Sequence, residues 1–303
     1  MRKKQILFAT TLIMTGLFAC KQKSFTRLAS GLEYRIESHE KDGKKPVEGD
    51  IVTMHIKTVT GDTTIYDSRL ANNNKAVPAQ ITKPQYNGDI MEGITFLTIG
   101  DSAQFRVIAD SIFKGNPLPP FIKSGDTVRF YVKIESISTQ QEYQKIQEQE
   151  ASTQISAEDA TIQQYLKDNN LNATKTASGL YYVITSPGSG ANAQKGQEIT
   201  MNYTGRLLDG TAFDSNEDPK FGHVAPFKFP LGMSRVIKGW DEGVALLNKG
   251  AKAKLIIPSP LAYGASGQNG IPANSILVFD VQMLDAKAMP AQEMPAQQMP
   301  STK

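Results

Sequence analysis

Three short stretches in the C-terminal third of the chain have the composition of strands, and several of them alternate apolar and polar residues with a period of two. They cover residues 198–203, 252–258 and 276–284. This period is typical of strands with one buried face. Asp209-Gly210 lies between apolar runs and is a hairpin turn signal. We therefore expect an antiparallel sheet in this part of the chain.

A single helical pattern accompanies these strands, over residues 239–249. It places Trp240, Val244 and Leu247 on one face, at the i, i+4, i+7 spacing of an amphipathic helix. The fold class predicted here is α+β, with an antiparallel sheet curved around one short helix. Trp240 would face the space between the helix and the sheet.

Residues 139–172 contain neither proline nor glycine and are rich in Gln and Glu, which predicts a helical linker. Ser156 with Asp159 three residues later predicts an N-cap. Ile162, Tyr165 and Leu166 form a narrow apolar stripe. The stripe could dock on a domain or pair two chains into a homodimer, but we expect a solvated spacer, rising about 1.5 Å per residue.

The only tryptophan lies in a segment that is unusually rich in aromatic residues. Aromatic side chains at alternating strand positions can simply fill a core. They can also line an apolar pocket for a small ligand or peptide. Composition alone does not choose between these interpretations.

The order and spacing of three motifs favour the second interpretation. They are Val236-Ile237-Lys238-Gly239-Trp240-Asp241-Glu242-Gly243, Ala262-Tyr263-Gly264-Ala265-Ser266-Gly267 and Val278-Phe279-Asp280-Val281. Together they closely resemble the FKBP-type peptidyl-prolyl cis–trans isomerases, over residues 174–286. The resemblance implies an enzyme that assists the folding of exported proteins by isomerising X-Pro bonds, with proline-containing polypeptides as partners.

The same resemblance implies which residues would line a proline pocket. Tyr203 and Phe213 would be walls with Asp214 beside them, Trp240 the floor, Phe279 the far side, and Tyr263 a hydroxyl donor. The substrate-binding residues would be Phe227, Phe229, Val236, Ile237 and Ile271. The loop at 266–274 has Gln268 where the family often has an aromatic residue or histidine, which bears on substrate preference.

The chemistry implied for such a pocket needs no nucleophile. Rotation about the X-Pro amide is opposed by a resonance barrier of about 18–20 kcal/mol. A dry pocket disfavours the charge-separated planar amide, while the Ile237 N–H and the Tyr263 hydroxyl would hold flanking carbonyls. Asp214 would be an orienting acceptor, or alternatively a cap of the turn at Ser215-Asn216. This mechanism predicts a rate that is nearly flat between about pH 6 and 8.

The chain also repeats itself at long range. Ala29-Ser30-Gly31-Leu32 returns as Ala177-Ser178-Gly179-Leu180, 148 positions later, and further matches follow at offsets of 147–150. This predicts two related domains, at 21–138 and 173–286. In this register Tyr203, Trp240 and Tyr263 correspond to Ile56, Ile90 and Phe113. We interpret 21–138 as a degenerate FKBP-like domain that binds a partner, orients the second domain or holds unfolded chains, with weak activity as the alternative.

The two ends of the chain carry different signals. Residues 1–20 have a basic start, a short apolar run and a final Cys20, which predicts a lipoprotein signal peptide with Cys20 as the lipidated residue. The alternative is an ordinary secretory signal. We therefore expect a lipid-anchored protein in the envelope of a Gram-negative-type bacterium, on the outer membrane facing the periplasm. Residues 287–303 repeat Met, Pro, Ala and Gln and predict a disordered tail.

Charge and composition narrow the function classes further. Without residues 1–20 the chain has 30 Lys+Arg and 30 Asp+Glu, and no basic stripe predicts nucleic-acid binding. A single cysteine excludes an intrachain disulfide. The three histidines are scattered along the chain without the spacing of metal ligands, so we expect no bound metal and no other cofactor. Two hypotheses remain: a prolyl isomerase, or a non-catalytic chaperone or scaffold that only binds unfolded chains.

Overall fold

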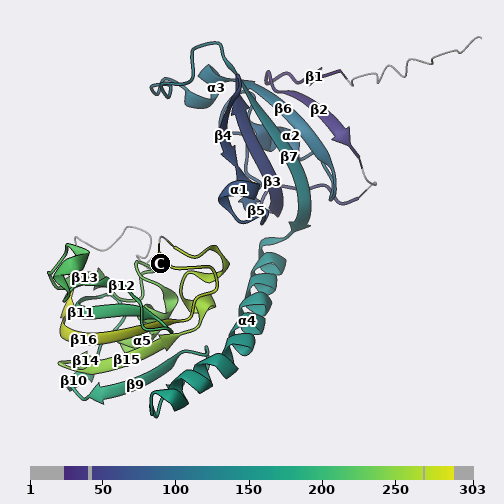
Figure 1. Cartoon of the computed structure of the whole chain (residues 1–303). Coiled ribbons are helices and arrows are strands. Elements are labelled where there is room, and N and C mark those ends of the chain that lie inside the picture. The colour runs from purple at the N-terminus through teal and green to yellow at the C-terminus, as the bar shows by residue number, and fades with distance from the viewer. Residues whose placement is uncertain (1–23, 40–42, 269, 290–303) are drawn as a thin grey trace, which may run out of the picture. The chain divides into compact units, whose positions relative to one another are not determined.

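The computed structural model describes residues 24–39, 43–268 and 270–289. The predicted signal peptide, Cys20 and residues 290–303 of the predicted tail lie outside this part. The chain divides into two compact units, Met1–Gln140 and Gln141–Lys303 (Figure 1). Among the described helices, none is both long and apolar enough to cross a membrane.

The second unit is an antiparallel sheet with one α-helix, α5, on its inner face (Figure 1). The strand order is β12-β11-β16-β15-β9-β8, and β13 also pairs with β11. The bounds are β8 Thr174–Lys175, β9 Tyr181–Ser186, β11 Gln197–Leu207, β12 Ala212–Ser215, β13 Phe227–Pro230, β15 Lys252–Ile257, β16 Leu277–Ala288 and α5 Lys238–Ala245. Short elements complete it: β10 Ser189–Asn192 paired with β14 Asn248–Lys249, and the 3₁₀ turns η1 Pro219–Phe221, η2 Ser259–Leu261 and η3 Gly264–Ser266.

The predicted α+β class is therefore confirmed, with adjusted boundaries. Strand β11 is longer than predicted, and α5 ends before Leu247, which is nevertheless buried. Strand β16 continues through Ala288, two residues into the segment predicted as tail.

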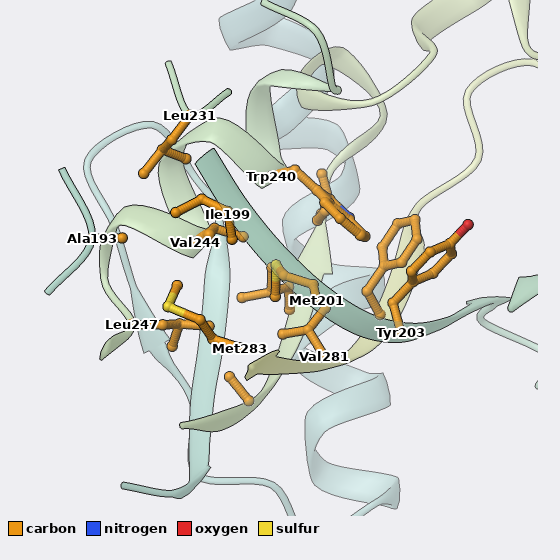
Figure 2. Close-up of a cluster of buried hydrophobic side chains, with 14 of the residues drawn as sticks. Ala193, Ile199, Met201, Tyr203, Leu231, Trp240, Val244, Leu247, Val281 and Met283 are labelled. Carbon is orange, nitrogen blue, oxygen red and sulfur yellow. The ribbon is translucent and has the colours of Figure 1, made fainter. Parts of the chain in front are cut away.

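Alternation along the strands gives this unit its core. Ile199, Met201 and Tyr203 of β11 point to the same side, and all three are buried with Trp240 and Val244 of α5 (Figure 2). The helix approaches the sheet closely because it carries glycine at the contact. A Cβ at position 243 would stand 2.8 Å from the Leu255 side chain.

The first unit has the same architecture, with strand order β1-β2-β6-β7-β3-β4 and β5 also paired with β3. When the second sheet is taken in the direction β8-β9-β15-β16-β11-β12, each strand of the first sheet has its counterpart at the same place, and β5 corresponds to β13. The bounds are β1 Thr26–Arg27, β2 Glu33–Ser38, β3 Ile51–Thr60, β4 Thr63–Asp67, β5 Val77–Gln80, β6 Ser102–Ile108 and β7 Thr127–Ser138, with helices α1 Ser68–Ala71, α2 Ile90–Ile94 and α3 Ala109–Phe113.

One side-chain contact is also repeated between the units. Ser30 donates to Glu92 at 2.5 Å, and Ser178 donates to Glu242 at 2.5 Å. In each case the serine lies just before the first long strand and the glutamate on the helix inside the sheet. The two units therefore share a local detail as well as a topology.

Helix α4, Gln140–Asp168, differs from the predicted linker in two ways. It starts 16 residues before Ser156, whose hydroxyl donates to the Ser152 carbonyl within the helix instead of capping it. Its C-terminal half is not a solvated spacer, because Ile162 and Leu166 are buried. They pack on side chains of the outer face of the second sheet: Tyr181, Ile256, Ile276 and Val278.

Candidate active site

Six aromatic rings of the second unit form one contact cluster. The Trp240 ring is central, with its centroid 5.2 Å from those of both Tyr203 and Phe279 and nearly perpendicular to each. Edge-to-face packing of this kind is a favourable arrangement of aromatic quadrupoles. The remaining rings attach to these three: Phe213 on Phe279, and Phe227 and Phe229 on Trp240.

The rings meet because a strand residue without a side chain lies between them. Gly205 of β11 pairs with Phe279 of β16, and a Cβ at this position would stand 2.6 Å from the Phe213 ring and 2.7 Å from the Phe279 ring. The alternation of β11 places Tyr203 two residues earlier on the same face. Glycine at 205 thus leaves the space in which Phe213 and Phe279 contact each other.

The cluster is closed toward the core and open at one edge. Trp240 and Phe279 are each 4% exposed, whereas Phe227 is 38% exposed. Figure 2 shows the Tyr203 hydroxyl at the outer end of its ring, away from the aliphatic core side chains. The exposed part of the aromatic surface therefore lies at this edge.

A hydrogen-bonded chain of polar groups lies at the open edge. The Tyr203 hydroxyl donates to Asp214 at 2.7 Å, and the other Asp214 oxygen is 2.9 Å from His223 Nε2. Burial and then the hydrogen bond to Asp214 raise the pKa of Tyr203 above its ordinary value. Burial and the Asp214 charge also raise the pKa of Tyr263. Both hydroxyls thus remain protonated donors at neutral pH.

The turn after Asp214 is held by its neighbours. Ser215 Oγ accepts from the Glu217 and Asp218 N–H groups. The buried Asn216 side chain accepts from the Tyr203 N–H and donates to the Met201 and Ala225 carbonyls. The capping role considered for Asp214 is therefore wrong, and its carboxylate faces Tyr203 and His223.

The segment before α5 supplies backbone donors. Ile237 is the N-cap residue, and Asp241 in the first turn accepts from the Gly232 and Ser234 N–H groups. Within the described residues the Ile237 N–H has no hydrogen-bond partner. Val236 and Ile237 are half-buried and pack against the core of the second unit, to which Trp240 also belongs.

Tyr263 follows the 3₁₀ turn η2, and a residue far away in the sequence holds this turn through hydrogen bonds. The buried carboxylate of Glu158 on α4 accepts from the Ser259 N–H at 2.8 Å and from the Ser259 hydroxyl at 2.5 Å. Further along, Gln268 and Ile271 exchange backbone hydrogen bonds, and Ile271 is buried in the second unit's core. Tyr263 is half-buried beside the cluster, and no partner of its hydroxyl lies within the described chain.

The structure thus brings together all the residues that the family resemblance indicated. It adds His223, Asn216, Gly205 and Glu158, which the sequence analysis missed. Another unanticipated feature is the Trp240 indole N–H, which is buried with no acceptor among the described residues.

The first unit lacks this cluster. The positions that correspond to Tyr203, Trp240 and Tyr263 hold Ile56, Ile90 and Phe113. Tyr34 and Phe96 form the one ring pair found among its described residues. Asp67 accepts from the Arg69 N–H and caps α1. No group of His, Cys, Asp or Glu suited to hold a metal occurs in the described parts of either unit.

Comparison with known proteins places the second unit in a family. The model of the FKBP-type peptidyl-prolyl cis-trans isomerases matches residues 190–284. Peptidyl-prolyl cis-trans isomerase Fkbp12 of Drosophila melanogaster is 50% identical over 107 residues, which cover 35% of this chain and 95% of that protein.

Two bacterial proteins were also found. FKBP-type peptidyl-prolyl cis-trans isomerase FkpA of Aeromonas hydrophila is 46% identical over 108 residues, 36% of this chain and 38% of that one. The crystal structure of FkpA from Escherichia coli is 36% identical, covering 48% of this chain and 65% of that one, with a TM-score of 0.39. The match to Fkbp12, which spans nearly that whole protein, shows that the chain belongs to the FKBP-type peptidyl-prolyl cis–trans isomerases.

Proposed function

We propose that the ring cluster around Trp240 is where this isomerase rotates X-Pro bonds during protein folding. The proposal rests on one observation: hydrogen-bond donors without partners occur in the same unit as the partly exposed aromatic cluster. The Ile237 N–H, the Tyr263 hydroxyl and the Trp240 indole N–H all lack acceptors among the described residues. The Trp240 indole N–H is buried, and buried donors without partners are rare in folded proteins. Ile237 and Tyr263 are half-buried, and the carbonyls of a bound peptide can accept from their free donors.

Each group then has a role in the rotation. The rings hold the pyrrolidine and keep water from the amide, which disfavours the dipolar planar form. The Ile237 N–H and the Tyr263 hydroxyl fix the carbonyls on either side, so that the peptide is held while one bond turns. Asp214 orients the Tyr203 ring through its hydroxyl. No proton transfer is required.

A matched pair of hydroxyl deletions tests this assignment. In a proline-peptide isomerisation assay on the full chain, Tyr263→Phe should lower kcat/KM about 3- to 10-fold, the value of one neutral hydrogen bond. Tyr66→Phe, the same change in the first unit, should leave it unchanged. Equal rates in both variants would remove Tyr263 from the site, and equal losses would point to a general effect.

For the first unit we propose a binding role without catalysis. This proposal is supported by the missing rings and by Phe113, which has no hydroxyl, at the position of Tyr263. A Trp240→Phe variant that loses isomerase activity should still suppress aggregation of an unfolded protein. If aggregation suppression disappears together with isomerase activity, the second unit carries both functions.

We further propose that Cys20 is lipidated and anchors the protein in the cell envelope, on the outer membrane facing the periplasm. Support comes from the sequence of residues 1–20 alone. Metabolic labelling with a palmitate analogue should mark the chain, and Cys20→Ser should abolish the label. A labelled Cys20→Ser chain would refute the anchor.

A further inference from the structure

Helix α4 covers a row of side chains on the outer face of the second sheet. The row crosses four paired strands and consists of Lys175, Tyr181, Ile256 and Val278. Asp159 of α4 contacts Lys175 at 2.5 Å and accepts from the Tyr181 hydroxyl at 2.7 Å. The helix is thus held by apolar contacts along the row and by an acidic side chain at its basic end.

The first sheet has the same row with different chemistry. The same registers place Arg27, Glu33, Arg106 and Arg129 side by side on β1, β2, β6 and β7 (Figure 1). Arg106 and Arg129 stand where the second sheet has Ile256 and Val278. These four residues line a cavity of about 490 Å³, to whose wall Gly61 and Asp126 also contribute. We call this the arginine row.

Among the described residues no carboxylate pairs with the Arg106 or Arg129 guanidinium, although Arg129 donates to the Gly61 carbonyl. The Arg27 side chain is 72% exposed, and its ion pair with Glu33 spans 3.7 Å. Arg106 lies over the Phe25 ring at 3.6 Å from the centroid, and no acceptor for it was found in the described residues. Asp126 accepts from the Lys123 N–H. The row therefore offers positive charge next to an aromatic surface.

We propose that the arginine row is a docking surface for an acidic helical segment of a partner polypeptide. The corresponding row of the second unit already binds a helix, with Asp159 on its basic residue. Replacing its apolar centre by arginines selects carboxylates, which guanidinium groups bind in a two-pronged geometry. This inference builds on the binding role proposed for the first unit and names its surface.

The test uses the full chain and two labelled helical peptides of 18 residues. One carries Glu along one face, and the other carries Gln at the same positions. By fluorescence anisotropy at low salt, the Glu peptide should bind at least about tenfold more tightly than the Gln peptide. The double variant R106Q/R129Q should lose about tenfold in affinity for the Glu peptide.

Two further variants distinguish a loss of the docking surface from a loss of the folded structure. Glu33→Gln removes the acid within the row and should increase affinity for the Glu peptide about threefold, a gain that an unfolded chain cannot give. Lys57→Gln with Lys133→Gln removes two cations elsewhere on the same sheet and should change affinity less than about twofold.

Several results would overturn the proposal. One is equal binding of the Glu and Gln peptides, and another is indifference to R106Q/R129Q. A third is arginine-dependent binding of phosphatidylglycerol vesicles without binding of the Glu peptide, which would assign the row to a lipid surface. Isomerase activity of the same variants is a separate readout, so a failed docking surface and a failed isomerase site remain distinguishable.

Discussion

Glu158 on α4 provides a sharp quantitative test of how the isomerase unit is built. Its buried carboxylate accepts two hydrogen bonds from Ser259, which is 0% exposed. Glu158→Ala leaves both Ser259 donors without an acceptor. An unsatisfied buried donor costs about 1–3 kcal/mol, and relief of the buried carboxylate's desolvation offsets part of this. We expect a loss of roughly 2–4 kcal/mol in the unfolding free energy.

Urea unfolding followed by tryptophan fluorescence is the suitable assay, because Trp240 is the only tryptophan and reports on the second unit. Since Ser259 begins the turn that leads to Tyr263, we also expect kcat/KM to fall about 3- to 10-fold under native conditions. Glu148→Ala, an exposed change on the same helix, is the control. A Glu158→Ala loss below about 0.5 kcal/mol would refute the structural role of α4.

Four other predictions follow from the site. Gly205→Ala should destabilise the second unit by about 1–3 kcal/mol in urea unfolding, because its Cβ would overlap two rings; an unchanged midpoint would contradict this. Asn216→Ala removes three hydrogen bonds next to Tyr203 and should lower the unfolding free energy by about 2–4 kcal/mol. A urea midpoint equal to that of the wild type would show that Asn216 does not hold the strand. Because the pKa values of Tyr203 and Tyr263 are raised, the isomerisation rate should stay flat from about pH 6 to 8; a bell-shaped profile that persists in His223→Asn would indicate a catalytic base. For the same reason, the stability from the Tyr203–Asp214 bond should be complete below the unfolded phenol pKa of about 10 and disappear as pH rises through the higher folded pKa.

Local sequence patterns were sufficient to predict three strands of the second unit, β11, β15 and β16, and its helix α5. Alternation over residues 198–203 predicted the side of β11 that carries Tyr203, and the spacing of Trp240 and Val244 predicted the buried face of α5. These signals are local because each side chain's direction follows from its own strand or helix.

The docking of α4 was harder to predict, although a signal existed. Leu255-Ile256-Ile257 and Ile276-Leu277-Val278 are continuous apolar runs, which indicate strands covered on both faces. Phe105-Arg106-Val107 in the first unit alternates instead. The narrow stripe on α4 gave no indication of which surface it would meet.

The polar members of the site could not be predicted, because they depend on loop geometry. His223 lies nine residues after Asp214 and meets it only through the path of the connecting loop. Glu158 and Ser259 are separated by 101 positions. The aromatic members were identified by family resemblance, since an aromatic strand residue in a core has the same pattern as one in a pocket.

The indole N–H resonance of Trp240 offers the most direct test of the central claim, since a single tryptophan gives a single indole signal. Titration of the full chain with a short X-Pro peptide should shift this resonance until it saturates, and the same peptide with alanine in place of proline should not shift it. If the X-Pro peptide is isomerised by the chain while the Trp240 resonance stays in place, catalysis occurs elsewhere and the site proposed around this ring is wrong.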